Sequence, residues 1–589
     1  MGRYIDWRVM NLGADFKEIA ARLGIDQVMA RVIVNRGQDT PEKQRKYVQG
    51  TLEDIPDPEL MLNCREAAEL LGEKLQAKKK IRIMADYDVD GVTSCYVLLD
   101  ALRSLGADVS YDIPDRLTDG YGMSVRMVEE AFRDGVDTLL TCDNGISAHE
   151  SISRAKAHGM TVIVTDHHQI LGDLPDADVI VNPWQKGCPY PYKEICGVEV
   201  AYKVIRVLAG ILGSPLPPEK YLEFVALGTC CDVMPIMEEN RIIIREGLKL
   251  MARTENVGLR ALLTVNGLSG MQLTTYHLGF ILGPSINSEG RLASAKEAME
   301  LLLMTDRQQA EAKAEEIKAL NQTRKAATIE GTEFAFGYLD ETGKGESDHV
   351  IVLLIPELHE SLAGIVAGKI KTRYYRPTIV FARSETEPGL LKGSGRSIEG
   401  YNMVEKLGEA KDLLNGFGGH KMAAGMSIRE ENLEAFAKRL NQLDGLTENE
   451  LTEKVYIDVP MPLSYVSNEL AEQIEKLEPF GTGNPKPVFA DRRLRLVGVR
   501  WLGRSGRYFR LTFEDERAFR SEVVTFDGEP LFQDIKMWLE LEDCDRIMHG
   551  HDLERVPKMD IIYTLSVNEY NGSREAQCKL EHYRRSAED

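Results

Sequence analysis

The sequence has no pair of cysteines spaced as CxxC, although nine cysteines are scattered along its 589 residues. This excludes a zinc-finger type of site and a disulfide framework, and is typical of reduced thiols in a reducing compartment. Long apolar runs are missing as well, because stretches such as VLAGILG at 207–213 are too short to span a bilayer. The charged first residues lack the apolar core of a signal peptide. We therefore expect a cytoplasmic protein with no membrane partner.

Basic charge is scarce, since 72 Lys and Arg face 93 Asp and Glu, for a net charge of −21. Phosphate contacts depend on local patches rather than on the total, however. Residues 492–513, RRLRLVGVRWLGRSGRYFRLTF, hold seven arginines and no acidic residue. Alternating cations and aromatics suit tracking of a nucleic-acid backbone with base stacking, and the candidates are Arg500, Trp501, Arg504, Arg507 and Tyr508. The alternative is an amphipathic edge strand with a basic solvent face.

The length predicts two to four domains. Strand-like runs at 81–85, 107–114, 136–143 and 161–168 alternate with helical ones, which indicates a parallel sheet with helices on both faces. An Ala-, Glu- and Lys-rich stretch at 295–335 predicts a long helix or helix pair, a second α/β region opens at 348, and Gly-punctuated β runs near the end favour a small barrel or sandwich. The expected divisions are an N-terminal segment (1–60), a main α/β domain (61–250), a helical region with a connecting helix (251–340), a smaller α/β domain (341–445) and a barrel (455–570).

Acidic and imidazole side chains gather at the carboxyl ends of predicted strands. The clusters are DYDVDG (86–91), CDNG (142–145), DHH (166–168) and GTCCDVMP (228–235). In an open α/β sheet the carboxyl ends of the strands are where ligands bind. Crowded carboxylates repel one another, and bound cations relieve that repulsion. Each cluster alone also fits a turn or loop, but their joint occurrence favours a metal site, with oxygen-rich ligands suited to Mn²⁺ or Mg²⁺.

The same motifs, in this order, resemble those of the DHH phosphoesterase superfamily. They read DYDVDGVTS, IPDRLTDGYG, CDNGIS, DHH and ALGTCCDVMP. Further motifs resemble the RecJ family of single-stranded-DNA exonucleases: GPSINSEGRL, ELHESLAGIVA, GSGRS and FGGHKMAAG. The resemblance covers about residues 30 to 500. It implies a parallel-sheet DHH catalytic domain, a smaller α/β DHHA1 domain joined to it by a long helix, and a C-terminal OB-like β-barrel.

The resemblance further implies a phosphodiesterase with two Mn²⁺ or Mg²⁺ ions. Asp88 and Asp90 would each bind a different ion, and Asp143 would bridge the two. His167 and Asp232 would complete one coordination shell. Two further side chains are expected as ligands or as supporting partners in catalysis, namely Asp86 and His168. Cations about 3.5–4 Å apart can activate a water and stabilise both oxygens of an in-line displacement.

Other residues are implied as substrate contacts. Arg116 would form a pocket for a 5′-terminal phosphate together with Ser394 and Arg396, because an arginine fork suits phosphate geometry. Arg291 would steady the scissile phosphate as charge develops. Two histidines of the second α/β domain would either contact the substrate or serve a structural role, and these are His359 and His420.

The chain departs from the family pattern at three positions. Ala85 stands where the family usually has Gly, Ser285 stands in place of Arg, and Ser361 stands in place of Gly. None of these removes an implied metal ligand, but the geometry of the DNA channel is affected.

The implied activity is 5′→3′ hydrolysis of single-stranded DNA to mononucleotides, in repair and recombination. The implied partners are single-stranded DNA and a single-strand-binding protein or helicase, and a monomer is expected. Two alternatives remain open. One is a phosphodiesterase acting on short oligoribonucleotides or other nucleotide phosphoesters. The other is a non-catalytic DNA-binding scaffold.

Overall fold

The computed structural model describes residues 5–115, 119–292, 294–502, 508–526, 528–539, 541–548, 558–570 and 572–587. Among these residues, none of the helices combines the length and apolarity that crossing a lipid bilayer demands. The chain divides into two compact units. One comprises Met1–Ile55, Pro235–Arg245 and Lys454–Asp589, and the other comprises Pro56–Met234 and Glu246–Glu453.

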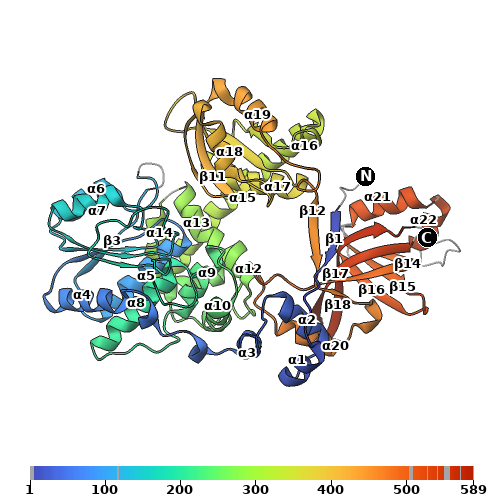
Figure 1. Cartoon of the computed structure of the whole chain (residues 1–589), viewed down its shortest axis with the longest axis horizontal. Coiled ribbons are helices and arrows are strands. Elements are labelled where there is room, and N and C mark those ends of the chain that lie inside the picture. Colours follow the sequence, from blue (N-terminus) through green and yellow to red (C-terminus); the bar gives the residue numbers. More distant parts are fainter. Residues whose placement is uncertain are drawn as a thin grey trace. The chain divides into compact units, whose positions relative to one another are not determined.

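The larger unit contains a parallel sheet with the strand order β3-β2-β4-β5-β6. Its strands are β2 (Ile81–Met84), β3 (Val109–Asp112), β4 (Thr138–Cys142), β5 (Thr161–Thr165) and β6 (Val179–Val181). The sheet lies between two layers of helices (Figure 1), which are α4 (Cys64–Gln76), α5 (Val89–Ser104) and α8 (Gly197–Ile211), and α6 (Val125–Arg133) and α7 (His149–Ala157). The central strands β4 (TLLTC) and β5 (TVIVT) are almost completely buried, as expected for strands that are covered on both faces. The expected parallel sheet is confirmed.

The prediction that GTCCDVMP follows a strand is wrong. This stretch ends the helix α9 (Leu222–Cys231), and Asp232 is its C-cap. The preceding run LEFVALG is apolar throughout, and such a run fits a buried helix as well as a buried strand, so periodicity does not separate them. Asp232 therefore comes from the end of a helix.

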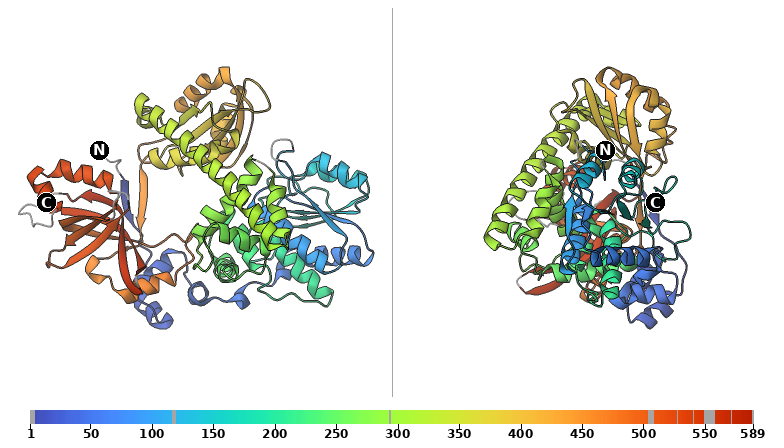
Figure 2. Two further views of the ribbon diagram at one scale, coloured as in Figure 1. Left: turned by 180° about the vertical axis from the view of Figure 1, so that it is seen from behind. Right: turned by 90° about the vertical axis from the view of Figure 1, so that its left-hand side faces the viewer.

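A helical region continues the larger unit. It consists of α10 (Glu238–Met251), whose first half belongs to the smaller unit, α11 (Val257–Val265), α12 (Thr275–His277), the π-helical turn η3 (Leu278–Leu282), α13 (Gly283–Leu292), α14 (Ala295–Leu303) and α15 (Arg307–Thr342). The stretch expected as a long helix or helix pair is thus a pair, α14 and α15. The second of these leads into the other α/β domain of this unit (Figure 2), after the short α16 (Lys344–Ser347).

This domain has a mixed sheet with the order β10-β11-β9-β8-β7, in which only β7 and β8 are parallel among the described pairs. Its strands are β7 (Ile351–Leu354), β8 (Thr378–Arg383), β9 (Leu390–Arg396), β10 (Leu414–Gly419) and β11 (Ala423–Arg429). Its helices are α17 (Ala363–Tyr374), α18 (Met403–Glu409) and α19 (Leu433–Gln442). Val366 and Ile370 of α17 pack on one face, and Phe436 of α19 packs against Phe381 on the other.

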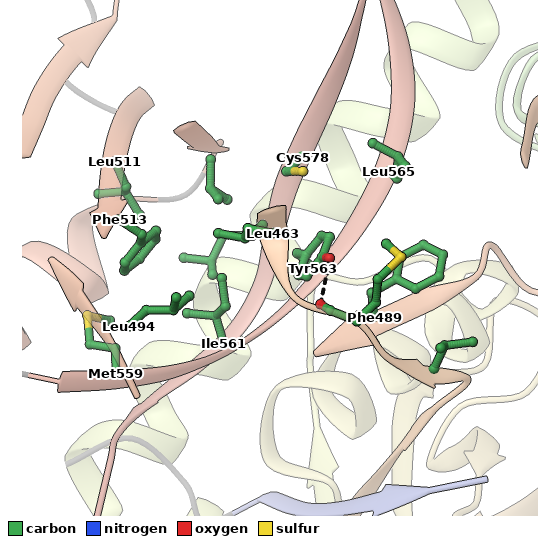
Figure 3. Packing of buried hydrophobic residues seen from close by; sticks show 14 of the residues in the cluster. Leu463, Phe489, Leu494, Leu511, Phe513, Met559, Ile561, Tyr563, Leu565 and Cys578 are labelled. Carbon is green, nitrogen blue, oxygen red and sulfur yellow. Dashed lines mark hydrogen bonds between the residues drawn. The ribbon is translucent and has the colours of Figure 1, made fainter. Parts of the chain in front are cut away.

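The smaller unit is built on a mostly antiparallel barrel. Its strands are β13 (Val459–Pro460), β14 (Val488–Leu502), β15 (Tyr508–Glu514), β16 (Arg520–Thr525), β17 (Lys558–Tyr570) and β18 (Ser573–Arg585). The order β13-β14-β15-β16-β18-β17 closes through an additional pairing of β14 with β17. In this barrel β13 pairs with β14, and β16 with β18, in parallel. Figure 3 shows its core, where the Tyr563 hydroxyl donates to the Met461 carbonyl at 2.9 Å. Three helices accompany it, α20 (Asn468–Glu475), α21 (Glu529–Trp538) and α22 (Leu541–Met548).

The first residues of the chain belong to this barrel unit. Strand β1 (Ile5–Val9) pairs with β12 (Glu453–Ile457), and three helices follow, α1 (Phe16–Leu23), α2 (Gln27–Asn35) and α3 (Pro41–Gln49). Met29 and Ile33 of α2 are buried in the same core as Phe489 of the barrel. The Arg36 guanidinium contacts the Asp458 carboxylate at 2.5 Å, and both side chains are buried. Sequence-distant segments therefore share one hydrophobic core.

Candidate metal centre

The turn from β2 into α5 carries aspartates at alternate positions. Asp88 is the N-cap of α5, and its carboxylate accepts a hydrogen bond from the Gly91 N–H at 3.0 Å. Glycine is needed at position 91, because a Cβ there would lie 2.3 Å from the Asp86 carbonyl oxygen. The buried Asp86 carboxylate accepts from the Gly122 N–H at 3.3 Å. The turn thus fixes both carboxylates at the carboxyl end of the strand.

Asp90 lies in the first turn of α5 and meets the start of α8. Its carboxylate accepts hydrogen bonds from the N–H groups of Gly197 at 2.6 Å and Val198 at 2.9 Å. The amino end of a helix favours a negative charge, so α8 both orients and stabilises this carboxylate. A Cβ at Gly228 of α9 would lie 2.7 Å from the same carboxylate, so α8 and α9 both pack closely against Asp90.

Asp143 follows β4 with a φ of 60°. This left-handed region is uncommon for residues other than glycine, and Asp and Asn tolerate it best. Gly197 approaches it so closely that a Cβ there would lie 2.6 Å from the Asp143 Cβ. Backbone strain of this kind concentrates at functional sites. The position combines a strained backbone with a neighbour that must be glycine.

His167, just after β5, points its Nε2 atom at three carboxylates. The Nε2 atom lies 3.1 Å from Asp143 Oδ1, 3.5 Å from Asp232 Oδ2 and 3.7 Å from Asp90 Oδ2. Within the described part of the chain, the buried His167 Nε2 and Asp232 Oδ2 atoms have no hydrogen-bond partner. Buried polar atoms are normally hydrogen-bonded. An imidazole nitrogen and a carboxylate oxygen that lie side by side without such bonds therefore fit a role as metal ligands.

His168 is held by Asp166, the first residue of the DHH motif, for which the sequence predicts no role. Asp166 Oδ1 accepts from the His168 N–H at 3.0 Å and lies 2.7 Å from its Nδ1. The Tyr121 hydroxyl lies 3.2 Å from the same ring and donates to the Asp143 carbonyl at 3.1 Å. Burial opposes a charged imidazole, but the bond to Asp166 outweighs it and raises the pKa of His168 to about 9.

Burial raises the proton affinity of the carboxylate cluster. Together with the neighbouring Asp88, it raises the pKa of Asp86 to about 8. Burial and then the Asp90 charge raise the pKa values of Asp143 and Asp232 well above the ordinary range. Burial likewise raises the pKa of Asp90. Neighbouring carboxylates repel one another when they are ionised together. A bound cation offsets this repulsion.

Three overlapping groups of side chains have the composition and spacing to hold metal ions. Within each group the ligand atoms lie within 4.8 Å of one another, and the groups are Asp143, His167 and His168; Asp90, His167 and Asp232; and Asp86, Asp88 and Asp143. Asp143 and His167 each belong to two groups, so neighbouring ions can share ligands. Carboxylate oxygens with imidazole nitrogens suit Mn²⁺ or Mg²⁺. Together with the orphaned atoms of His167 and Asp232, this donor set fits a bound divalent metal.

A second site candidate is a cavity of about 470 Å³ in the smaller α/β domain. Its lining includes Ser394 and Arg396 of β9, together with Lys392 and Ser361. Arg396 Nη1 donates to Ser394 Oγ at 3.1 Å. A Cβ at Gly364 of α17 would come within 2.7 Å of Ser394 Oγ and 2.8 Å of Arg396 Nη2, so a glycine leaves room for both groups. The cavity therefore offers cationic and hydroxyl donors in one place.

The two histidines of this domain have different surroundings. His359 Nε2 lies 3.0 Å from the Glu385 carboxylate, and His359 Nδ1 accepts from the Ser361 N–H at 3.2 Å. His420 is exposed between β10 and β11. Ser285, one of the departures, is buried in α13 and donates to the Ile281 carbonyl at 2.7 Å. Ala85 is fully buried beside the first motif.

Some expected site residues lie outside the described residues. Arg116, Arg504 and Arg507 are among them, as is the side chain of Arg291. On the barrel, Arg500 is exposed, and Trp501 and Tyr508 are 39% and 40% exposed. Other arginines of the run are paired with acidic groups of neighbouring segments. Arg495 lies 2.6 Å from Glu514, Arg510 lies 3.1 Å from Glu522, and Arg493 lies 3.5 Å from Glu516.

Comparisons with known proteins agree with this architecture. The model of the DHH family N-terminal domain matches residues 80–229, the DHHA1 domain model matches 347–443, and the RecJ OB domain model matches 457–582. The single-stranded-DNA-specific exonuclease RecJ of Bacillus subtilis is 34% identical over 583 residues, which cover 98% of this chain and 70% of that protein. The chain belongs to the RecJ family. The RecJ protein of Escherichia coli is 33% identical, over 93% of this chain and 94% of its own length.

Solved RecJ structures have the same fold. The crystal structure of RecJ in complex with Mn²⁺ from Thermus thermophilus superposes with a TM-score of 0.81 at 29% identity, covering 99% of this chain and 80% of that chain. A crystal structure of exonuclease RecJ bound to manganese has a TM-score of 0.59 at 34% identity, covering 68% of this chain and 97% of that chain. The RecJ assignment thus rests on sequence and on structure, including the barrel domain.

Proposed function

We propose that this chain is a metal-dependent exonuclease that degrades single-stranded DNA from its 5′ end and releases mononucleotides. The observation that carries the proposal is the buried cluster of carboxylates and imidazoles at the carboxyl ends of β2, β4 and β5. It occurs in a chain that is 34% identical, over nearly its whole length, to a single-stranded-DNA-specific exonuclease.

The chain's own residues would hold two ions, Mn²⁺ or Mg²⁺. Asp90, His167 and Asp232 would hold one, and Asp86 and Asp88 the other, with Asp143 shared between them. When bound, such ions supply an activated water and neutralise charge that develops on the phosphoryl oxygens. Asp166 holds the His168 ring through its Nδ1 atom at 2.7 Å, which leaves the other ring nitrogen to form a hydrogen bond with a phosphate oxygen. Arg291 would steady the scissile phosphate.

The cavity around β9 supports the proposed 5′→3′ polarity, because it could bind the phosphate at a 5′ end. Ser394 and Arg396 would bind a terminal phosphate there, joined by Arg116. A charge-assisted arginine contact recognises a phosphomonoester, which an internal phosphodiester does not offer in the same form. Exposed Arg500, Trp501 and Tyr508 of the barrel would track the strand behind the end, together with Arg504 and Arg507.

Two other functions are less well supported. A phosphodiesterase for short oligoribonucleotides has no use for the barrel, and the match to the RecJ OB domain spans residues 457–582. A non-catalytic scaffold would be expected to lose metal ligands, yet every proposed ligand side chain is present and clustered. We also propose that the protein works in the cytoplasm as a monomer, in repair and recombination, with a single-strand-binding protein or a helicase as partner.

An assay with end-labelled single-stranded DNA, RNA and dinucleotides tests the proposal. With Mn²⁺ or Mg²⁺, a 5′ label on DNA should be released first as a mononucleotide, and a chelator should stop the reaction. First release of a 3′ label would contradict the polarity, and preferred cleavage of dinucleotides would favour the phosphodiesterase alternative.

The phosphate pocket has its own test. Arg396→Ala should reduce the preference for 5′-phosphorylated over 5′-hydroxyl DNA by roughly tenfold or more, because a charged hydrogen-bond donor is lost. Arg383→Ala, on the neighbouring strand β8, is the matched control, since Arg383 is exposed and lies 3.4 Å from Glu430. An unchanged preference in Arg396→Ala would remove this cavity from end recognition.

A further inference from the structure

An exposed pair of aromatic rings lies in the larger unit, at a place that none of the family motifs explains. Tyr276 of α12 is 60% exposed and Phe280 of the π-helical turn η3 is 66% exposed. Their ring centroids are 5.2 Å apart with an interplanar angle of 21°, so the two rings are stacked on each other at the surface. Exposed large apolar side chains that cluster need an explanation, whereas isolated ones do not.

The segment around these rings has no charged side chain of the Asp, Glu, Lys or Arg type. This holds for residues 261–288, in a chain where such residues make up 28% of the sequence. The exposed side chains of this segment therefore offer no charge of their own to a charged protein partner. It does suit the flat, uncharged face of a nucleobase, which stacks on aromatic rings without regard to sequence.

The aromatic pair is anchored directly to the helix that carries a metal-ligand candidate. In the last turn of α9, Cys230 Sγ contacts the Thr275 carbonyl at 3.6 Å and Cys231 Sγ contacts the Leu278 carbonyl at 3.6 Å. A Cβ at Gly283 would lie 2.4 Å from Cys231 Sγ, so η3 can only lie this close to α9 because glycine follows it. Asp232 is the next residue after Cys231. Figure 1 places α12 beside α9.

The local backbone is also unusual on both sides of this contact. The turn η3 is π-helical, a form found mostly as single turns near functional sites. Val233, the residue after Asp232, is 64% exposed and has a φ of 60°, which is rare for a β-branched residue. Val233 therefore presents an apolar side chain to solvent immediately next to Asp232.

We propose that Tyr276 and Phe280 form a stacking platform for an unpaired nucleobase of the DNA strand whose phosphate is at the metal centre. The proposal rests on the proposed function and adds a specific contact to it. A base stacked here has both ring faces in contact with aromatic or base surfaces, which an unpaired nucleotide can achieve most freely. Because the platform contacts α9, it also fixes the position of the DNA strand relative to Asp232, whatever the identity of the base.

The test is a scan with 2-aminopurine, whose fluorescence is quenched when it stacks. Oligonucleotides of 5′-phosphorylated single-stranded DNA carry the probe at one position each, and they are mixed with the full-length protein and Ca²⁺ in place of Mn²⁺. The wild type should quench the probe at one or two positions near the 5′ end. The double variant Tyr276→Ala/Phe280→Ala should lose this quenching and bind the DNA about tenfold more weakly.

Two further variants keep the test specific. Phe132→Ala is the control, because Phe132 is also an exposed aromatic stacked on another ring, that of His158, but stands at the end of α6. It should leave quenching and affinity unchanged. Tyr276→Phe keeps the ring and should retain the quenching, which separates stacking from loss of a hydroxyl contact.

Each possible result of these measurements either supports or overturns the stacking platform. Quenching and affinity that stay at the wild-type level in the folded double variant would overturn the platform, even if the wild type cuts DNA normally. A wild type that neither binds nor cuts single-stranded DNA with Mn²⁺ would overturn the proposed function and the platform with it. Loss of quenching confined to the double variant supports the platform.

Discussion

The parallel sheet of the larger unit and the barrel of the smaller one differ in whether their clustered charged side chains are paired with groups of opposite charge. At the sheet, Asp90, Asp143 and Asp232 are gathered around one buried imidazole, and among the described residues none of the three forms an ion pair with a lysine or an arginine. On the barrel, arginines that are crowded in the sequence meet acidic partners, as Arg495 does with Glu514 at 2.6 Å.

This difference shows that charge density in the sequence does not measure the field at the surface. Paired arginines on neighbouring strands largely cancel, so their contribution to binding a polyanion is small. Burial, and then the repulsion between neighbouring carboxylates, raises the pKa values of Asp143 and Asp232, so these groups need a cation to be ionised together. The acidic centre is therefore the more informative of the two regions, although the basic run is the more conspicuous one in the sequence.

The largest expected effect tests the acidic side of this comparison. Asp143→Asn keeps the left-handed backbone but removes the shared carboxylate, and we expect hydrolysis to fall by more than about a thousandfold while single-stranded DNA still binds. Asp108→Asn, an exposed residue before β3, is the control and should retain activity. Initial rates and binding isotherms measure both. Activity of Asp143→Asn within tenfold of wild type would contradict a shared metal ligand.

A pair of glycines on α8 tests how tightly the centre is packed. Gly197→Ala places a Cβ 2.6 Å from the Asp143 Cβ, and we expect a loss of about 3 kcal/mol in unfolding free energy together with weaker metal binding. Gly210→Ala, near the other end of the same helix, has open space around it and should stabilise the protein by about 0.5–1 kcal/mol. Denaturant titrations compare them, and equal effects would contradict the close approach.

The pH dependence of stability sharpens the comparison further. The pKa of Asp86, raised from 3.8 to about 8, means that the folded state holds its proton more tightly than the unfolded state. Its contribution to stability is complete below about pH 4 and is lost as the pH rises through about 8. His168, with a pKa raised to about 9, acts in the same direction.

In a chelator, the melting temperature should therefore fall by about 2–8 °C between roughly pH 5 and pH 8. Mn²⁺ should restore it, and more strongly at the higher pH, because the ligands must lose protons to bind a metal. Scanning calorimetry with and without Mn²⁺ measures this. A melting temperature that rises with pH in the chelator would show that the carboxylates are not mutually destabilised.

The smallest expected effect tests the basic side. Arg500→Ala should weaken single-stranded DNA binding several-fold and lower the salt-dependence slope by about 0.7, since an exposed arginine can contact a phosphate. Arg510→Ala, on the paired strand β15, should change the affinity by less, because Arg510 lies 3.1 Å from Glu522. Binding measured across a salt series checks both variants. Equal losses would indicate that the ion pair opens to bind DNA.

Much of the main sheet could be predicted from the sequence, because β2, β4 and β5 are short apolar runs that end in polar turns. The helix α9 could not, since an apolar run of that length fits a helix as well as a strand. The convergence of Asp90 and His167 on Asp232 depends on where the starts and ends of α8 and α9 lie in space. The same holds for the barrel, where the arginine–glutamate pairs depend on the register of β14, β15 and β16.

Two functional residues have roles that the sequence did not predict. Asp166 supports His168 through a buried hydrogen bond, and only its place directly before the histidines at a strand end could have drawn attention to it. Gly197 looks like an ordinary glycine in the sequence, yet α8 could not approach Asp90 and Asp143 with any larger residue there. The role of Gly197 arises from close packing between segments that are far apart along the chain, whereas Asp166 acts on a histidine two residues away.

The most direct test of the acidic centre is anomalous diffraction from crystals of the full-length chain grown with Mn²⁺. We predict two manganese peaks at the carboxyl edge of the main sheet. One should be bound by Asp90, His167 and Asp232, the other by Asp86 and Asp88, with Asp143 bound to both. A single peak, or none at this edge, would contradict the account.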